Sequence, residues 1–233
     1  MASSVASRTP RAHAPIDNDD AVMARAVAFA SWARTNARIL TTATGLVLVA
    51  AAGYMYYRYY ESHREGRAGA EFLMVAAEAR NGGNEAVVSR DLDNFYHKFD
   101  GTVEADQARL LLGQIKLKNN QPKAALPLFD AVGGHRSPLR VQGMMLAGAT
   151  KAASGDLNGA AVTLRSAADQ AKLAYEKNQA LRQLALVQEQ KGDWPGAVAT
   201  WQQLVDATEK GSPERGETEM RLGEAQAHVP AAR

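Results

Sequence analysis

The sequence predicts an all-α fold in which a single N-terminal transmembrane helix is followed by a solenoid of helix pairs. Three observations lead to this prediction. Alanine and leucine dominate an apolar content of 46%, and aromatic residues make up only 6%, which favours helix over sheet. One segment of nineteen residues has no charged side chain. Beyond that segment, charged and apolar residues recur at helical spacing, interrupted by glycine-containing turns.

The uncharged segment runs from Ile39 to Tyr57, and we expect a transmembrane helix over residues 37–60. At a rise of ~1.5 Å per residue the segment is about 28 Å long, close to the ~30 Å of a bilayer's hydrocarbon. Arginines bracket it, and tyrosines gather at its C-terminal end. The arginine counts on the two sides are equal, so charge alone does not orient the helix.

Three small residues inside this segment, Thr41, Gly45 and Gly53, lie four and eight residues apart and therefore share one helix face. Such a face lets a neighbouring transmembrane helix approach closely, so we expect helix packing there. The alternative is that these residues reflect only the high frequency of small residues in membrane helices.

Two segments precede the transmembrane helix. Residues 1–18 are rich in Ala, Ser, Pro and Arg without apolar periodicity, which predicts a disordered tail. Residues 19–36 predict a short amphipathic, interfacial helix capped by Asp19 or Asp20, with Trp32 near a membrane surface. The alternative for this helix is a frayed lead-in to the span.

Several function classes are disfavoured by composition. Beyond residue 38 the numbers of basic and acidic residues are equal, so this part of the chain has no net positive charge to attract nucleic acid. There is no cysteine, the five histidines are far apart, and no phosphate-binding glycine motif occurs. We therefore expect no enzyme activity, no metal, no cofactor and no small-molecule substrate.

A repeat of 36 and then 37 residues is visible beyond the span. Polar turns at 119–121, 155–157 and 192–194 are followed by a small residue and, four positions later, by Leu128, Leu164 or Trp201. Such a unit is a helix pair, because the turn reverses the chain and the large residue fills the space between helices. The predicted helices cover residues 61–80, 84–99, 104–118, 122–132, 138–153, 158–172, 175–190, 194–209 and 213–227.

The clearest unit, Gly192-Asp193-Trp194 with Ala197 and Trp201, resembles the tetratricopeptide repeat. The small residue of that family's first helix is matched by Gly148 and Ala185, whereas Gly113 stands one place out of register. The resemblance implies a tetratricopeptide-like helical-repeat domain over residues 61–233.

A second resemblance covers most of the chain from about Ala26. The short helix with AVAFASWARTNAR, the glycine-containing span and the exit Tyr57-Arg58-Tyr59-Tyr60 before the repeats look like the YfgM-type ancillary subunits of the bacterial Sec translocon. The resemblance implies a bacterial inner-membrane protein with a cytoplasmic N-terminus and a periplasmic C-terminal domain. It further implies contacts with the translocon and with periplasmic chaperones.

In a stack of helix pairs the first helix of each unit lines the concave face. By register, this interpretation predicts a partner-binding face made of Arg109, Lys116, Gln142, Met145, Gln179, Arg182 and Glu189. The alternative is an ordinary solvated surface.

The sequence thus predicts a membrane-anchored adaptor or scaffold that binds other proteins. The alternatives are a structural subunit of another large membrane complex, respiratory or photosynthetic, and an enzyme with an unrecognised site.

Overall fold

The computed structural model describes residues 18–134 and 136–229, and every regular element within them is a helix. The ten helices are α1 (Asn18–Thr35), α2 (Ala37–Arg80), α3 (Glu85–Lys98), α4 (Val103–Lys118), α5 (Pro122–Gly134), α6 (Arg140–Ala153), α7 (Leu157–Gln170), α8 (Ala174–Lys191), α9 (Trp194–Ala207) and α10 (Pro213–Ala227). The predicted tail lies outside the described residues except for Asn18, which begins α1.

The chain divides into two units, residues 1–61 and residues 62–233. The first unit contains α1 and the N-terminal part of α2. Most of its described apolar side chains are exposed: Leu46 and Val49 each expose 72% of their surface. Both proposed capping residues, Asp19 and Asp20, lie inside α1.

The segments predicted as the transmembrane helix, 37–60, and as the first helix of the repeat domain, 61–80, form one continuous helix, α2, which ends at Arg80. No proline lies between residues 54 and 80, and the glycines there, Gly66 and Gly69, are helical. A helical glycine costs only about 1 kcal/mol, which its helical neighbours readily offset.

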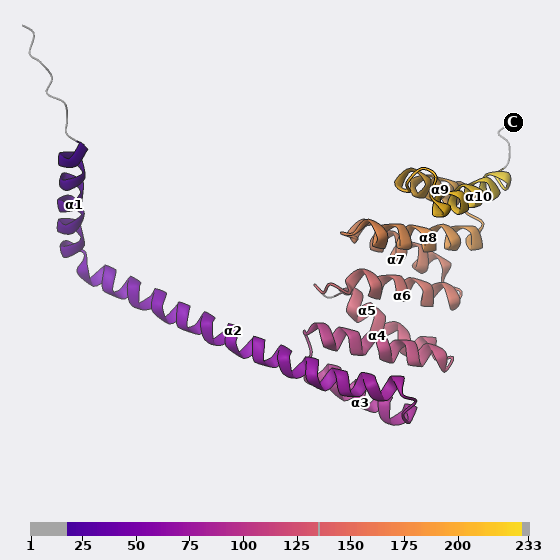
Figure 1. The fold of residues 1–233 in the computed structure, drawn as a ribbon, viewed down its shortest axis with the longest axis horizontal. Coiled ribbons are helices and arrows are strands. Elements are labelled where there is room, and N and C mark those ends of the chain that lie inside the picture. The colour runs from indigo at the N-terminus through magenta and orange to yellow at the C-terminus, as the bar shows by residue number, and fades with distance from the viewer. Residues whose placement is uncertain (1–17, 135, 230–233) are drawn as a thin grey trace, which may run out of the picture. The chain divides into compact units, whose positions relative to one another are not determined.

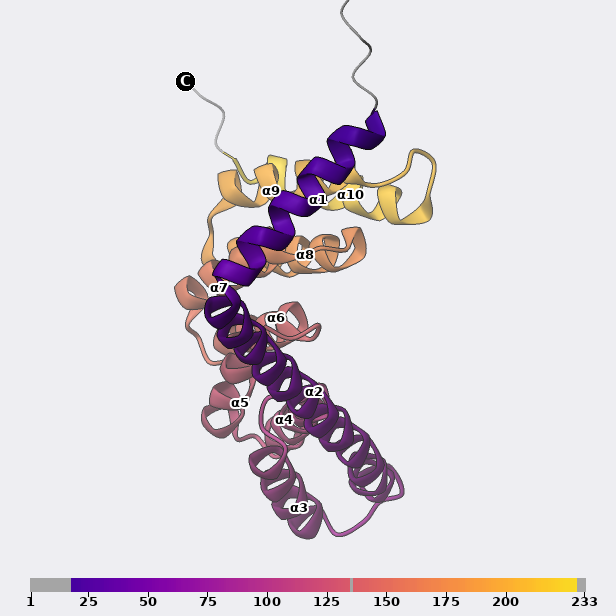
Figure 2. The same cartoon turned by 90° about the vertical axis from the view of Figure 1, so that its left-hand side faces the viewer.

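The second unit is a stack of helix pairs in two layers. Figures 1 and 2 show α4, α6 and α8 in one layer, with α5 and α7 in the other. The C-terminal part of α2 pairs with α3 through a core that includes Ala68, Phe72, Leu92 and Phe95. First helices of the pairs are therefore the end of α2, α4, α6 and α8, and second helices are α3, α5, α7 and α9.

The turns inside the pairs use one repeated device. Asn120, Gly155 and Gly192 all adopt positive φ, at 56°, 87° and 77°. In the second and third of these turns an aspartate follows, and the side chain of Asp156 or Asp193 accepts a hydrogen bond from the backbone N–H three residues later. The helix N-terminus is thereby capped where the chain reverses.

Each pair is closed by a small residue on the first helix that faces a large one on the second. A methyl group added to Gly113 would overlap the ring of Phe129, and one added to Gly148 would lie 2.6 Å from Leu164 Cγ. Phe129 and Leu164 are completely buried. Ala185 and Trp201, both buried, occupy the equivalent places in the third pair. The separation between small and large residue is sixteen in all three pairs.

This pairing corrects the register predicted for the first of these three units. Phe129 rather than Leu128 is the large residue, and Ala125 rather than Ala124 is the buried small residue of the second helix. The cause is Asn120, which takes the positive-φ position that glycine holds in the other turns, since asparagine tolerates this conformation. Aligned on Asn120, Gly113 is in register after all.

The pattern extends to both ends of the stack. Ala76 and Leu92 are buried and again sixteen residues apart, which places a fourth pair at the end of α2 and α3. In α10, Leu222-Gly223 matches Leu184-Ala185 of α8: Leu222 lies in the core formed with α8 and α9, and nothing lies within 4 Å of a carbon added to Gly223. No helix follows α10 in the described part of the chain.

One buried ion cluster joins α4 to the loop before it. The guanidinium of Arg109 donates to Asp106 at 3.0 Å and to Asp100, and its Cζ lies 4.7 Å from the ring centre of Tyr96. The side chains of Arg109 and Asp106 expose only 8% and 4% of their surface. Burial raises the pKa of the Tyr96 hydroxyl above its usual value, and its hydrogen bond to Asp93 adds to this shift.

Gly113→Ala should destabilise the second unit by about 1–3 kcal/mol, because the new methyl group has no space beside the buried Phe129 ring. Gly223→Ala is the matched control: nothing lies within 4 Å of its added carbon, so helix propensity should stabilise α10 by up to about 1 kcal/mol. Guanidinium unfolding of the full chain, followed by tryptophan fluorescence, measures both changes. Equal effects would contradict the pairing.

Arg109→Glu should destabilise the second unit by about 3 kcal/mol or more, because it replaces the buried cation between Asp100 and Asp106 with a third negative charge. Arg182→Glu is the comparison. Its side chain is partly exposed and lies 3.9 Å from Glu217, so the loss should stay below about 1 kcal/mol. The same unfolding experiment applies, and an Arg109 variant as stable as the Arg182 variant would refute the structural role.

Candidate functional site

The exposed surface of α4, α6 and α8 carries glutamine at equivalent positions. In each of these three helices an exposed glutamine stands six residues before the buried small residue. These three residues are Gln107, Gln142 and Gln179. Because the three helices stack in one layer, equivalent exposed positions fall on the same side of the stack (Figure 1). We call this surface the first-helix face.

A second row of this face lies seven residues further along each helix. It consists of Gln114, Ala149 and Leu186, all exposed. Between α6 and α8 these rows border a groove of about 330 Å³, lined by Ala149, Ala153, Gln183 and Gln190. The Oε1 atom of Gln183 is buried there and has no hydrogen-bond partner among the described residues.

The chemistry of this face is neutral and rich in hydrogen-bonding groups. Each glutamine amide offers two N–H donors and an accepting oxygen, which match the groups of a polypeptide backbone. The groove floor between them is formed by alanine and leucine, so it can also receive apolar side chains. The face is therefore suited to holding a peptide segment by its backbone.

Two of the seven predicted partner-binding residues, Gln142 and Gln179, lie on this face. Met145 and Arg182 are half-buried beside them: Met145 packs against the core, and Arg182 lies near Glu217 on α10. Glu189 is also half-buried and accepts a hydrogen bond of 2.6 Å from Trp201 Nε1. Glu189 thus ties α8 to α9 within its own pair.

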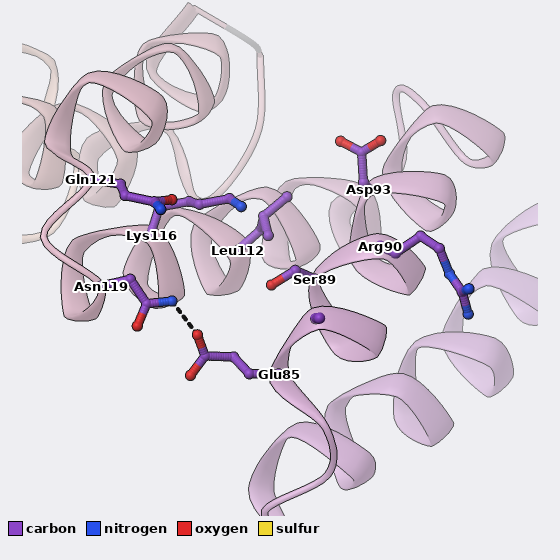
Figure 3. Close-up of a pocket in the computed structure, with 9 residues that line it drawn as sticks. Glu85, Ser89, Arg90, Asp93, Leu112, Lys116, Asn119 and Gln121 are labelled. Atoms are coloured by element: carbon purple, nitrogen blue, oxygen red, sulfur yellow. Dashed lines mark hydrogen bonds between the residues drawn. The ribbon is translucent and has the colours of Figure 1, made fainter.

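Lys116 lies elsewhere, in a pocket of about 490 Å³ between α3 and α4. Figure 3 shows Glu85 and Asn119 joined across this pocket by a hydrogen bond, with Arg90 directed away from Lys116. The lining carries both signs of charge, from Glu85, Asp93 and Lys116 among others. Lys116 therefore lines the pocket between α3 and α4 and does not belong to the glutamine rows.

Arg109 lies in the buried ion cluster, where its guanidinium is committed to Asp100 and Asp106. The register error explains its selection: counted from Gly113, Arg109 is equivalent to Met144 and Leu181, which belong to the core. The same error hid Gln107, the equivalent of Gln142 and Gln179, which alignment on Asn120 would have found. The row of Gln114, Ala149 and Leu186 was not part of the prediction.

The residues predicted to pack against a neighbouring transmembrane helix lie in the first unit. Thr41 is exposed, and its hydroxyl donates to the backbone carbonyls of Ala37 and Arg38 at 3.0 Å. A methyl group added to Gly45 or Gly53 would meet nothing within 4 Å. The packing of another helix at these residues stays a prediction.

Within residues 18–134 and 136–229 no group of three or more His, Asp or Glu side chains is arranged to hold a metal ion. Among the same described residues, α2 is the one helix that is long and apolar enough to cross a membrane. None of its most apolar stretch is buried.

Comparison with known proteins adds evidence on the fold. Residues 30–145, just under half of the chain, match the family model of a tetratricopeptide repeat-like domain. No curated protein matches. The chain is similar to crystal structures of nearly identical TPR-like repeats from a Podosopora anserina protein assigned as a kinesin light chain, and to a single-substitution variant of it.

These two structures have 16% and 17% sequence identity to this chain, and each gives a TM-score of 0.55. The similarity covers 70% of this chain and 87% of each of them. At this identity the likeness concerns the fold alone. The helix pairs, the family match and the solved structures together identify the fold as an all-helical, tetratricopeptide-like solenoid.

Proposed function

We propose that this protein is a membrane-anchored adaptor whose repeat domain binds other proteins. One observation carries the anchor: the uncharged segment Ile39–Tyr57 forms a helix whose apolar side chains are exposed on every side. Leu46, Leu48, Val49 and Met55 expose 65–72% of their surface. Water would oppose exposure of this extent, whereas lipid hydrocarbon would stabilise it.

The repeat unit supplies the binding function. Tetratricopeptide-like solenoids present long surfaces made of equivalent positions, and here the first-helix face repeats a neutral amide from helix to helix. A membrane anchor keeps such a surface beside one complex, which raises the effective concentration of the adaptor for its partner. Positioning is the proposed mechanism, and no chemical step is required of the chain.

We further propose that the protein is an accessory subunit of a bacterial inner-membrane complex such as the Sec translocon. The support is the resemblance of residues from about Ala26 onward to the YfgM-type subunits. In this proposal the N-terminus is cytoplasmic and the repeat domain is periplasmic, where it meets chaperones. A reporter enzyme that is active only in the periplasm, fused after Arg233, would be active in this topology and inactive in the opposite one.

The second candidate is a structural subunit of another large membrane complex, respiratory or photosynthetic. The small side chains at Thr41, Gly45 and Gly53 favour it, since a neighbouring helix could approach closely there. Stoichiometric recovery with one such complex after purification in mild detergent would support this candidate over the adaptor.

Leu48→Arg combined with Val49→Arg should release the protein from membranes, because each arginine near the bilayer centre costs about 2.5–3.5 kcal/mol. Val162→Arg combined with Met220→Arg is the matched control, since these side chains are similarly exposed on the repeat unit. Extraction of membranes with alkaline carbonate should leave the wild type and the control in the pellet. Release of the wild type would rule out the anchor.

Gln142→Glu combined with Gln179→Glu should reduce partner recovery several-fold, because it removes amide donors and adds charge to the first-helix face. Gln203→Glu combined with Gln226→Glu introduces the same charge at exposed positions of α9 and α10. The measurement is affinity purification in mild detergent with quantitative mass spectrometry. Unchanged partner recovery for the Gln142 and Gln179 variant, with both variants folded, would show that the first-helix face does not bind the partner.

A further inference from the structure

A second pocket lies at the edge of the repeat unit, where α5 leads into α6 and α7 leads into α8. Its volume is about 670 Å³, the largest of the pockets described for the second unit. We call it the edge pocket and define it by Arg136, Pro138, Arg140, Val141, Lys172 and Leu173. It is built from the segments that join one helix pair to the next and from the first turns of α6 and α8, so it borders the first-helix face at Gln142 and Gln179.

The charge of the edge pocket is positive. Arg136, Arg140 and Lys172 contribute three cations, and Glu176 is the one carboxylate in its lining. Arg136 and Lys172 are exposed, while Arg140 is half-buried and donates from Nε to the carbonyl of Gly133 at 3.0 Å. That hydrogen bond restrains the Arg140 guanidinium at the pocket wall. The local excess of two positive charges contrasts with the balance of charges beyond residue 38.

Two helix N-termini add to this positive potential. Both α6 and α8 begin at the edge pocket, and their capping positions, Leu139 and Leu173, offer no side-chain acceptor. By contrast, side chains cap the N-termini of α3, α4, α7, α9 and α10. At α6 the carbonyl and hydroxyl oxygens of Ser137 accept the N–H groups of Arg140 and Leu139. The remaining first-turn N–H groups carry a partial positive charge and strengthen the attraction of the three cations for an anion.

The pocket also has an apolar part. Val141 is buried in the pocket wall. Leu173 also lines the pocket but exposes 53% of its surface. Pro138 is exposed beside the cations. An anion alone would leave this surface uncovered, while a peptide with an apolar residue next to a carboxylate would cover both parts.

We propose that the edge pocket binds an acidic segment of a partner protein. One or two carboxylates of the segment pair with Arg136, Arg140 and Lys172, and a neighbouring apolar side chain packs against Leu173 and Pro138. Charge complementarity selects this occupant, because charge-assisted hydrogen bonds from arginine to carboxylate are the strongest that the pocket can make. The proposal rests on the adaptor function and assigns it a second surface for a partner of defined chemistry.

The test uses the purified full chain in a neutral detergent and a rhodamine-labelled peptide in which aspartates alternate with leucines. Fluorescence anisotropy should show saturable binding that weakens as salt is raised. A matched peptide with asparagine in place of aspartate should bind at least about tenfold more weakly. Equal binding of the two peptides would overturn the proposal.

Three variants localise the binding. Arg136→Glu combined with Lys172→Glu should weaken binding of the acidic peptide at least about tenfold. Arg165→Glu combined with Lys191→Glu makes the same change of net charge at exposed sites outside the pocket and should have a much smaller effect. Glu176→Gln should tighten binding, because it removes the pocket's carboxylate. A gain in affinity cannot arise from misfolding, so the test stands even if the charge-reversed variant is unstable.

Two further outcomes would also overturn the proposal: equal loss in both charge-reversed variants, and binding to phosphatidylglycerol vesicles without binding to the peptide. The latter would make the edge pocket a lipid site. The proposed function fails separately, in the purification experiment. An edge pocket without peptide affinity would leave partner capture by Gln142 and Gln179 unaffected.

Discussion

The repeat unit depends on one packing constraint: a small residue on each first helix must face a large residue on the second, sixteen positions later. Gly113 with Phe129 and Gly148 with Leu164 show why, since even one added methyl group would overlap the partner side chain. The close approach sets the distance between paired helices, and the large residue fills the space that remains. With four such pairs stacked, equivalent surface positions align from helix to helix, and a repeated glutamine becomes a continuous face.

A single helix serves two environments. Up to Glu61, α2 belongs to the first unit and exposes apolar residues on every side; from Ser62 it belongs to the repeat unit and buries Ala68 and Ala76. The change is encoded in the spacing of apolar residues, because the first part is apolar all round and the second only on one stripe. The proposed anchor and the first repeat are thus parts of one secondary-structure element.

Most of the repeat unit could be predicted from the sequence, because glycine, asparagine and proline mark its turns clearly. From α3 to α10 the predicted helices agree with the structure to within a few residues at their ends. Three features were not predictable in the same way. The junction near residue 61 carries no helix-breaking residue, Asn120 replaces a turn glycine, and Arg109 looks like any surface arginine until Asp100, Asp106 and Tyr96 surround it. Each depends on backbone conformation or tertiary neighbours, which residue types alone do not reveal.

Gly223 leaves the last helix of the stack open. Its place matches that of Gly148 and Ala185, where the second helix of a pair comes closest, and nothing lies within 4 Å of a carbon added there. Leu222 before it matches Leu184 and packs into the core shared with α8 and α9. α10 thus keeps the small residue that a first helix needs. Sequence design that lengthens this solenoid could therefore dock a second helix on α10 by placing a large apolar residue sixteen positions after Gly223.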